Sequence, residues 1–370
     1  MVRAALLRSV GAPLEIVDAE LAPPGPGHVR VALAASGVCH SDLSVANGTL
    51  PLGAPIVLGH EGAGVIAEIG PEVDGLAVGD HVVLSWVPQC GTCWSCRNGA
   101  PHLCTSSAGA GRHLSVDGEP VQQMMGLGTF ATETTVPVSA VVRIPSDVPL
   151  AQAALVGCAV LTGAGAAMNT AHLEPGGSVA VIGCGGVGLN AVQGARLAGA
   201  KTIIAIDVQP EKLLLATRFG ATHTIDATQV DPVARVRELM PGRGVDVAIE
   251  AIGVQATVDQ AVQLARPGGQ AVFVGIGGLA VNVSVPALQL IREGKSLTGC
   301  YYGSADVRRD VPRLLGHYAD GDLLLDELIT RRIALDEVNE AMELLQQGVV
   351  TRSVIEFASP AGTTGAAPAA

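Results

Sequence analysis

A glycine-rich hexapeptide, G-C-G-G-V-G, restricts the fold of this chain more than any other feature, because it joins an apolar run to a helix-like stretch. Its glycines are Gly183, Gly185 and Gly188, and the apolar run is 178–182. Glycine there permits a tight turn, a close approach of the backbone to a pyrophosphate and close packing of helix on strand. The following helix N-terminus offers N–H donors to phosphate. We therefore expect a dinucleotide loop that includes Gly186 and Val187.

An acidic residue ends the next apolar run, 202–207. It is Asp207, 24 residues after Gly183, near the spacing of a carboxylate that accepts from ribose hydroxyls. Its charge would repel the extra phosphate of NADP, and Val208 and Gln209 supply no arginine to balance that phosphate. NAD is therefore the expected cofactor. Lys212 is placed to reach the same ribose, although a helix-surface lysine fits the pattern nearly as well.

Strand-like and helix-like stretches alternate from 178 to 303, which predicts a parallel sheet covered on both faces. The first 150 residues are instead rich in short β-like runs separated by Gly and Pro, and a late strand-like run at 352–357 returns to that texture. We therefore expect the nucleotide-binding unit to be inserted into a β-rich domain. The expected limits are 1–160 and 303–358 for the β-rich domain, with the cysteine loop 90–104 in its first part, 161–302 for the inserted domain, and 359–370 for a disordered tail.

Composition favours a folded protein that acts on small molecules. The chain has 370 residues, of which 48% are hydrophobic, enough for two cores. Its net charge of -12 disfavours nucleic acid and anionic membranes as partners, since both favour a basic face. The N-terminal residues lack the pattern of a signal peptide, so the cytoplasm is the expected location.

Four cysteines lie close together in one loop and match a closed, structural zinc site. They are Cys90, Cys93, Cys96 and Cys104. Four thiolates at this spacing bind zinc tetrahedrally and fix a loop rather than react. Free or disulfide-bonded cysteines remain open as alternatives, as does a zinc ribbon that contacts nucleic acid.

A second set of possible ligands is dispersed along the chain. It consists of Cys39 in G-V-C-H-S-D, His60 and Glu61 in G-H-E-G-A-G, and Cys158 in L-V-G-C-A-V. Each alone would more often be structural, since a lone buried cysteine behaves as a small hydrophobe. Together they match two cysteines and a histidine with an open fourth position, the catalytic form of zinc site.

These motifs occur in the order found in the zinc-containing medium-chain alcohol dehydrogenases, and the chain resembles that family over almost its full length. The resemblance implies an α/β fold: a GroES-like β-rich catalytic domain with an inserted Rossmann doubly wound parallel sheet. It also implies two Zn²⁺ per subunit, the catalytic one held by Cys39, His60 and Cys158. Glu61 would be a transient or outer ligand, and Asp42 would orient His60.

The resemblance also implies the reaction: hydride leaves a zinc-bound alkoxide for NAD, and the reverse reaction reduces an aldehyde. Ser41 corresponds to the residue that accepts the alcohol proton. Ser44 stands where many relatives have histidine, so water or another group would complete the relay. His40 and Arg352 match positions that meet the cofactor pyrophosphate, with a surface ion pair as the alternative for Arg352. Thr162 matches a nicotinamide contact.

Four residues align with positions that line the alcohol cleft of relatives: Leu50, Trp86, Met124 and Met125. For the two methionines, a role in core packing is equally compatible with the pattern. Leu50 stands where the glutathione-dependent formaldehyde dehydrogenases generally have an acidic residue, which disfavours that branch.

We therefore expect an enzyme that oxidises a primary or aromatic alcohol to an aldehyde with NAD. A thiol-dependent formaldehyde dehydrogenase is the nearest alternative, and a non-catalytic NAD- and zinc-binding regulatory protein is a more distant one. The resemblance further implies assembly through the edge of the Rossmann sheet, giving a homodimer, with a tetramer as the alternative.

Overall fold

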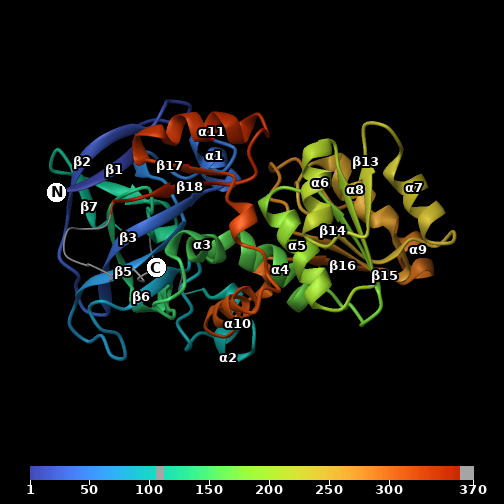
Figure 1. The fold of residues 1–370 in the computed structure, drawn as a ribbon, viewed down its shortest axis with the longest axis horizontal. Coiled ribbons are helices and arrows are strands. Elements are labelled where there is room, and N and C mark those ends of the chain that lie inside the picture. Colours follow the sequence, from blue (N-terminus) through green and yellow to red (C-terminus); the bar gives the residue numbers. More distant parts are fainter. Residues whose placement is uncertain (106–111, 359–370) are drawn as a thin grey trace, which may run out of the picture. The chain divides into compact units, whose positions relative to one another are not determined.

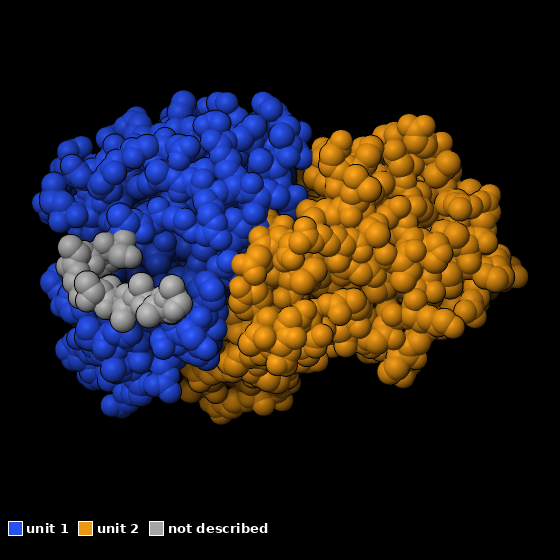
Figure 2. Space-filling view, in the orientation of Figure 1, with its two compact units in different colours: residues 1–88, 107–157, 329–370 blue, residues 89–106, 158–328 orange. Residues whose placement is uncertain are grey.

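The computed structural model describes residues 1–105 and 112–358. The chain divides into two compact units, shown in separate colours in Figure 2. Unit 1 consists of Met1–Pro88, Ser107–Gly157 and Ile329–Ala370, and unit 2 consists of Gln89–Ser106 and Cys158–Leu328. The tail predicted at 359–370 lies outside the described residues.

Unit 2 is built on a six-stranded sheet in which every neighbouring pair is parallel. The order is β13-β12-β11-β14-β15-β16. Successive strands are added on one side of β11 up to β13 and on its other side from β14 onward, so the switch point of the sheet lies between β11 and β14. The strands are β11 (Ser178–Ile182), β12 (Thr202–Asp207), β13 (His223–Asp226), β14 (Val245–Glu250), β15 (Ala265–Phe273) and β16 (Ser296–Gly299). The predicted doubly wound parallel sheet is confirmed.

Helices cover this sheet on both sides (Figure 1). Ala180 and Ile182 of β11 join a core with side chains from α7 and α8, whereas Val179 and Val181 face the other side because strand side chains alternate. Both faces of β11 are therefore covered, in agreement with its burial along the whole length. The helices of unit 2 are α2 (Trp94–Arg97), α4 (Leu161–Gly165), α5 (Gly186–Leu197), α6 (Pro210–Arg218), α7 (Pro232–Leu239), α8 (Gln255–Leu264), α9 (Ala287–Glu293) and α10 (Val307–Ala319), with short turns η1 (Pro101–Leu103), η5 (Ala166–Thr170), η6 (Tyr302–Ser304) and η7 (Asp326–Leu328).

Unit 1 combines a closed barrel with a seven-stranded sheet. The barrel has the order β1-β2-β7-β8-β4, and the sheet has the order β10-β6-β5-β3-β18-β17 with β9 added on β3. The strands are β1 (Val2–Leu7), β2 (Glu15–Leu21), β3 (His28–Val38), β4 (Ile56–Val57), β5 (Glu61–Ile69), β6 (His81–Leu84), β7 (Leu114–Val116), β8 (Glu119–Gln123), β9 (Glu133–Pro137), β10 (Val141–Arg143), β17 (Arg331–Ile333) and β18 (Ser353–Glu356). The helices are α1 (His40–Ala46), α3 (Leu150–Leu155) and α11 (Val338–Gln346), with η2 (Met124–Gly126), η3 (Val138–Ala140) and η8 (Leu335–Glu337). Because β18 pairs antiparallel with β3, the C-terminal strand returns to the first unit.

Two stretches group differently from the domain limits expected from the sequence. The cysteine loop 90–104 and residues 303–328 belong to unit 2, although both were assigned to the β-rich domain. Gln89 joins these stretches, since its side-chain amide donates to Ala305 O at 3.0 Å and accepts from Val307 N at 3.2 Å. No local pattern signals such distant hydrogen bonds. As functional domains, the expected limits stay a prediction.

The helical run Leu150–Thr170 joins the two units along the chain and contains the π-helical turn η4 (Val156–Val160). It is long and apolar enough to cross a membrane, but 89% of its most apolar window is buried within the protein. Such burial is typical of the central helix of a folded core.

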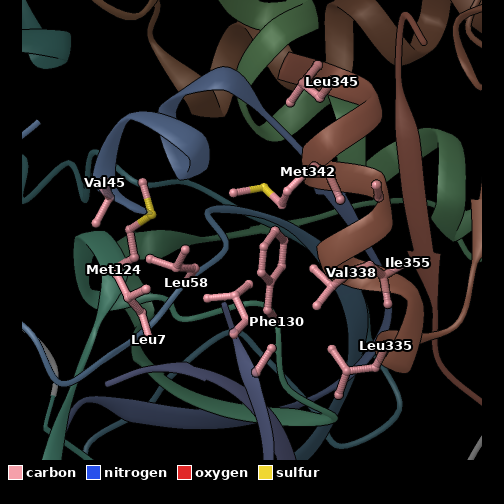
Figure 3. Close-up of a cluster of buried hydrophobic side chains, with 14 of the residues drawn as sticks. Leu7, Val45, Leu58, Met124, Phe130, Leu335, Val338, Met342, Leu345 and Ile355 are labelled. Atoms are coloured by element: carbon pink, nitrogen blue, oxygen red, sulfur yellow. The ribbon is translucent and has the colours of Figure 1, made fainter. Parts of the chain in front are cut away.

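An aliphatic core in unit 1 surrounds Phe130, which is fully buried (Figure 3). Leu7, Leu58 and Met124 approach the ring from the barrel side, and Val338 and Met342 approach it from α11. This core attaches α11 to the N-terminal barrel. It also includes Val45 of α1, the helix that follows Cys39.

We predict that Phe130→Ala lowers the free energy of unfolding by about 3–5 kcal/mol, because the surrounding aliphatic side chains would border a cavity. The matched control is Val78→Ala, since Val78 is 63% exposed, and its effect should stay within about 0.5 kcal/mol. Urea unfolding followed by circular dichroism measures both. Equal effects of the two substitutions would contradict the central position of Phe130.

Candidate active site and cofactor loop

The four cysteines of the loop at 90–104 gather around one point in unit 2, and one ligand atom from each lies within 4.8 Å of the others. Cys90 Sγ and Cys96 Sγ are 4.0 Å apart, and Cys93 Sγ and Cys104 Sγ are 3.8 Å apart. A tetrahedral zinc ion with Zn–S bonds of about 2.3 Å separates its sulfur ligands by about 3.8 Å. The arrangement therefore fits zinc.

Backbone geometry holds these sulfurs in place. Cys90 Sγ accepts from the N–H of Cys93 at 3.3 Å, and Cys93 Sγ accepts from the N–H of Cys96 at 3.5 Å, which caps α2. None of the four forms a disulfide in the described part of the chain. The disulfide alternative is therefore not adopted.

The second predicted set also comes together. One ligand atom each from Cys39, His60, Glu61 and Cys158 lies within 4.8 Å of the others, and all four residues are buried. Cys39 is the N-cap of α1, and Glu61 begins β5. Cys158 is in the π-helical turn η4, and such turns are frequent at functional sites.

Asp42 organises the unit 1 part of this group. Its Oδ2 accepts from the N–H of Cys39 at 2.9 Å, and its Oδ1 accepts from the N–H of Gly59 and pairs with His60 Nδ1, both at 3.0 Å. Asp42 is completely buried. The carboxylate therefore fixes both the start of α1 and the orientation of the His60 ring, as the sequence led us to expect.

His60 offers the clearest test of whether a metal fits here. Its Nε2 is buried and has no hydrogen-bond partner among residues 1–105 and 112–358, while Nδ1 is engaged by Asp42. An imidazole held by a carboxylate at one nitrogen, with the other nitrogen directed at two cysteines, is the usual arrangement of a zinc-binding histidine. The donor set fits a catalytic zinc site.

Glu61 has a partner that the sequence did not reveal. Arg352, which is 4% exposed, donates from Nη2 to Glu61 Oε1 and from Nη1 to Val38 O. Burial raises the pKa of the Glu61 carboxyl to about 7, and the Arg352 guanidinium opposes this shift. The ion pair considered for Arg352 therefore exists, but it is buried, and a sequence separation of 291 residues hides it from local patterns.

In unit 2, the glycine loop has the geometry expected for dinucleotide binding. Gly183 has a φ of +91°, a conformation that side chains rarely adopt. The loop ends at Gly185, the N-cap of α5, so Gly186, Val187 and Gly188 form the first helical turn. Their N–H groups face the carboxyl edge of the sheet, where open α/β sheets bind ligands.

Asp207 ends β12 beside this loop. Its Oδ2 accepts from the N–H of Cys184 at 2.6 Å, and its Oδ1 accepts from the N–H groups of Val208 and Gln209 at 2.8 and 3.0 Å. These bonds hold the carboxylate against the glycine loop. Burial and the Asp207 charge raise the pKa of the Cys184 thiol, while the Lys212 charge opposes this shift.

The remaining predicted contacts have different degrees of exposure. His40 is exposed, and Ser41 and Ser44 are half-buried on α1. Thr162 is 8% exposed, and its Oγ1 has no hydrogen-bond partner in the described chain. A buried hydroxyl of this kind, four residues after Cys158, is available to a ligand.

The four residues expected to line a substrate pocket pack against two cores of unit 1. Met124 is fully buried in the core around Phe130, so its side chain fills that core and we remove it from the pocket. Leu50 and Met125 are partly buried against the same core. Trp86 packs instead against the core of the large sheet of unit 1.

Together, a closed four-cysteine site, a Cys–His–Cys site and a dinucleotide loop define a zinc-dependent dehydrogenase. The model of the alcohol dehydrogenase GroES-like domain matches residues 25–146, and that of the zinc-binding dehydrogenase domain matches residues 186–319. An S-(hydroxymethyl)glutathione dehydrogenase of Escherichia coli O1:K1 / APEC is 38% identical over 367 residues, covering 96% of this chain and 99% of that protein.

Solved structures agree in fold. The crystal structure of a protein from Burkholderia ambifaria, described as an alcohol dehydrogenase zinc-binding domain protein, gives a TM-score of 0.92 at 34% identity. Benzyl alcohol dehydrogenase from Acinetobacter calcoaceticus gives 0.91 at 33% identity, and each comparison covers 96% of this chain and 99% of the other. The chain belongs to the zinc-containing medium-chain alcohol dehydrogenase family. The predicted GroES-like and Rossmann-type architecture, and zinc and a nicotinamide dinucleotide as cofactors, are thereby confirmed.

We predict that Asp42→Asn removes the zinc of the Cys39–His60–Cys158 site and spares that of the cysteine loop, since loss of such a carboxylate weakens metal affinity by about 10–100-fold. After dialysis against a weak chelator, elemental analysis should show a fall from about two zinc ions per chain toward one. The control is Asp80→Asn, whose carboxylate lies outside both groups of metal ligands, accepts from the N–H of Ala77 at 2.9 Å and pairs with Arg143 at 3.9 Å. Loss of both ions, or of neither, would contradict the role of Asp42.

Proposed function

We propose that this protein oxidises a primary or aromatic alcohol to an aldehyde with NAD and catalyses the reverse reduction. The observation that carries the proposal is the buried group of Cys39, His60 and Cys158, with His60 Nε2 directed into it. A zinc ion held by these residues supplies Lewis acidity, which lowers the pKa of a substrate alcohol. Glu61 lies in the same group, and its Oε2, which has no hydrogen-bond partner in the described chain, supports a role as an outer ligand, while its Oε1 accepts from Arg352.

Ser41 is the proposed first acceptor of the alcohol proton. It follows Cys39 by two residues on α1 and is half-buried. Ser44 lies one helical turn further along α1, on the same face as Ser41. A serine hydroxyl is not a base at neutral pH, so we propose that Ser44 passes the proton to water.

The proposed cofactor contacts are the residues expected from the sequence. Gly183, Gly185 and the first turn of α5 bind the pyrophosphate, with His40 and Arg352 supplying further phosphate contacts. Asp207 accepts from the ribose hydroxyls and disfavours NADP by its charge, and Lys212 assists at the ribose. Thr162 contacts the nicotinamide. The unpartnered, buried Thr162 Oγ1 and the fixed Asp207 carboxylate support these roles.

The proposed substrate pocket is apolar, with Leu50, Trp86 and Met125 as its lining. An apolar lining suits an alkyl or aryl alcohol, and Leu50 offers no charge to a thiol adduct.

The names of the E. coli relatives favour the alternative, a thiol-dependent formaldehyde dehydrogenase. A non-catalytic NAD- and zinc-binding regulatory role is the third candidate. A small alcohol or aldehyde is the proposed partner, rather than nucleic acid or membrane, and the cytoplasm is the proposed location.

The substrate prediction is tested by following NADH absorbance over primary, secondary and aromatic alcohols, and formaldehyde with and without glutathione. We expect thiol-independent reduction of NAD by benzyl or primary alcohols, at least about 100-fold better than reduction of NADP, because Asp207 meets the extra phosphate. Cys39→Ala should abolish this activity, and Cys300→Ala, at a buried cysteine outside both metal groups, should retain it. Activity only with glutathione would establish the alternative instead, and no turnover by zinc- and NAD-loaded protein would favour the regulatory role.

We also propose a homodimer formed through the edge of the unit 2 sheet. The edge strand is β16, and the preceding helix α9 has no buried residue although it carries Leu288 and Ile291, which are 67% and 77% exposed. Leu279, in the loop before α9, is 98% exposed. Exposed apolar groups beside an open sheet edge are typical of an interface. A tetramer would bury this edge as well.

We predict that the double substitution Leu288→Glu and Ile291→Glu converts the dimer to a monomer of 37.3 kDa in size-exclusion chromatography with light scattering. Charges at these positions would be desolvated in the interface. Leu214→Glu, on α6 and 74% exposed, is the control that should leave the mass unchanged. A monomeric wild type would overturn the proposal.

A further inference from the structure

Glu250 is a completely buried carboxylate at the carboxyl end of β14, and the mechanism above does not use it. We propose that Glu250 is a positioning residue that holds loop 251–254 in the conformation that supports the nicotinamide half of the cofactor. This inference rests on the proposed binding of NAD at the glycine loop of unit 2.

Three donors converge on one oxygen of this carboxylate. Glu250 Oε1 accepts from the N–H of Ile252 at 2.9 Å, the N–H of Gly253 at 2.7 Å and Thr257 Oγ1 at 2.7 Å. The first two belong to loop 251–254, and Thr257 lies in the first turn of α8. Glu250 therefore fixes the whole path from β14 to the following helix.

The loop held by Glu250 lies between two other loops of the same edge. On one side, Ile252 packs against Gly183 so closely that a Cβ atom there would collide with its side chain. On the other side, a Cβ at Gly253 would lie 2.6 Å from the N atom of Gly277. Loop 251–254 is therefore in close contact with both the glycine loop and the loop after β15.

Gly275 brings the loop after β15 against the carboxylate itself. A Cβ at Gly275 would lie 2.6 Å from Glu250 Oε2, the oxygen that has no hydrogen-bond partner in the described residues. Only glycine fits between this oxygen and loop 251–254. Glu250 thus sets the separation of the two loops.

The topology assigns these loops to one half of the cofactor. The order β12-β11-β14-β15 places the ribose-binding Asp207 at the end of β12 and the pyrophosphate loop at the end of β11. A dinucleotide that crosses the switch point therefore extends its second half over the ends of β14 and β15. Ile252 and Ile276, which are 44% and 62% exposed, provide apolar surface there.

Stability alone does not account for a carboxylate at this position. Glu250 has no ion-pair partner within the described ranges, so its buried charge is compensated only by hydrogen bonds. An apolar side chain would cover the strand end at lower cost. An acceptor oxygen is needed for the loop conformation, because only an acceptor can gather these donors.

The test compares Glu250→Ala with Asp246→Asn, a matched control in the same strand. Asp246 also accepts from a backbone N–H, that of Ser178 at 2.7 Å, but it lies at the opposite end of β14. Binding of NADH is measured by its fluorescence, and binding of ADP-ribose, which lacks nicotinamide, is measured by calorimetry. Circular dichroism and melting temperature report the fold of each variant.

We expect Glu250→Ala to weaken NADH binding by about tenfold or more while changing ADP-ribose binding by less than about threefold. Asp246→Asn should change neither affinity, whatever its melting temperature. Two further variants keep the test decisive if Glu250→Ala does not fold. Glu250→Gln keeps one acceptor oxygen and should retain most of the NADH affinity. Gly275→Ala should weaken NADH binding and leave ADP-ribose binding nearly unchanged.

Equal weakening of NADH and ADP-ribose, or unchanged NADH binding in the folded Glu250 variants and in Gly275→Ala, would overturn the inference. A wild type that binds neither ligand would overturn the cofactor assignment itself and the inference with it. The ADP-ribose measurement therefore separates a failure of the cofactor proposal from a failure of the Glu250 role.

Discussion

The hydrogen bonds of one buried carboxylate, Asp42, hold together the part of this protein on which its chemistry depends. Asp42 joins the backbone of Cys39, the backbone of Gly59 and the ring of His60. Two ligands from separate elements thus share one rigid connection, and the free nitrogen of His60 is directed inward. Because a buried anion needs donors on every side, the connection specifies the local backbone as well as the histidine tautomer.

The same principle recurs at the other functional positions. Asp207 accepts from three backbone N–H groups beside the glycine loop, and Glu250 accepts from two N–H groups and a hydroxyl beside the loop after β14. Glu61 instead pairs with Arg352. At Asp42, Asp207 and Glu250, a buried acid fixes irregular backbone next to a site, where neither helix nor strand satisfies the N–H groups. The apolar cores, such as that around Phe130, provide the rigid support.

Local patterns predicted the parts of the site whose residues are close together in the chain. The glycine loop and the cysteine loop are each complete within a short segment, and few kinds of site require glycines or thiolates at such short spacings. Ligand chemistry also singled out the dispersed set of Cys39, His60 and Cys158, and the family resemblance implied that these residues hold one zinc ion. For Met124 the sequence left a place in the pocket and a place in a core equally open, because its burial depends on which core surrounds it. That information is absent from its neighbours in sequence.

The sequence by itself determined the alternation of strands and helices, the dinucleotide loop, the acid that follows it and the two sets of metal ligands, since periodicity, glycine and ligand chemistry act over short distances. Only the tertiary structure decided that Arg352 pairs with Glu61 and that Glu250 holds loop 251–254 against the loop after β15. It also decided that Gln89 joins the cysteine loop to residues 305–307. These contacts join residues that are far apart in the chain or that lie in different loops. Their partners are chosen by the packing of whole units, because a buried polar group must find whatever donor or acceptor the fold brings to it.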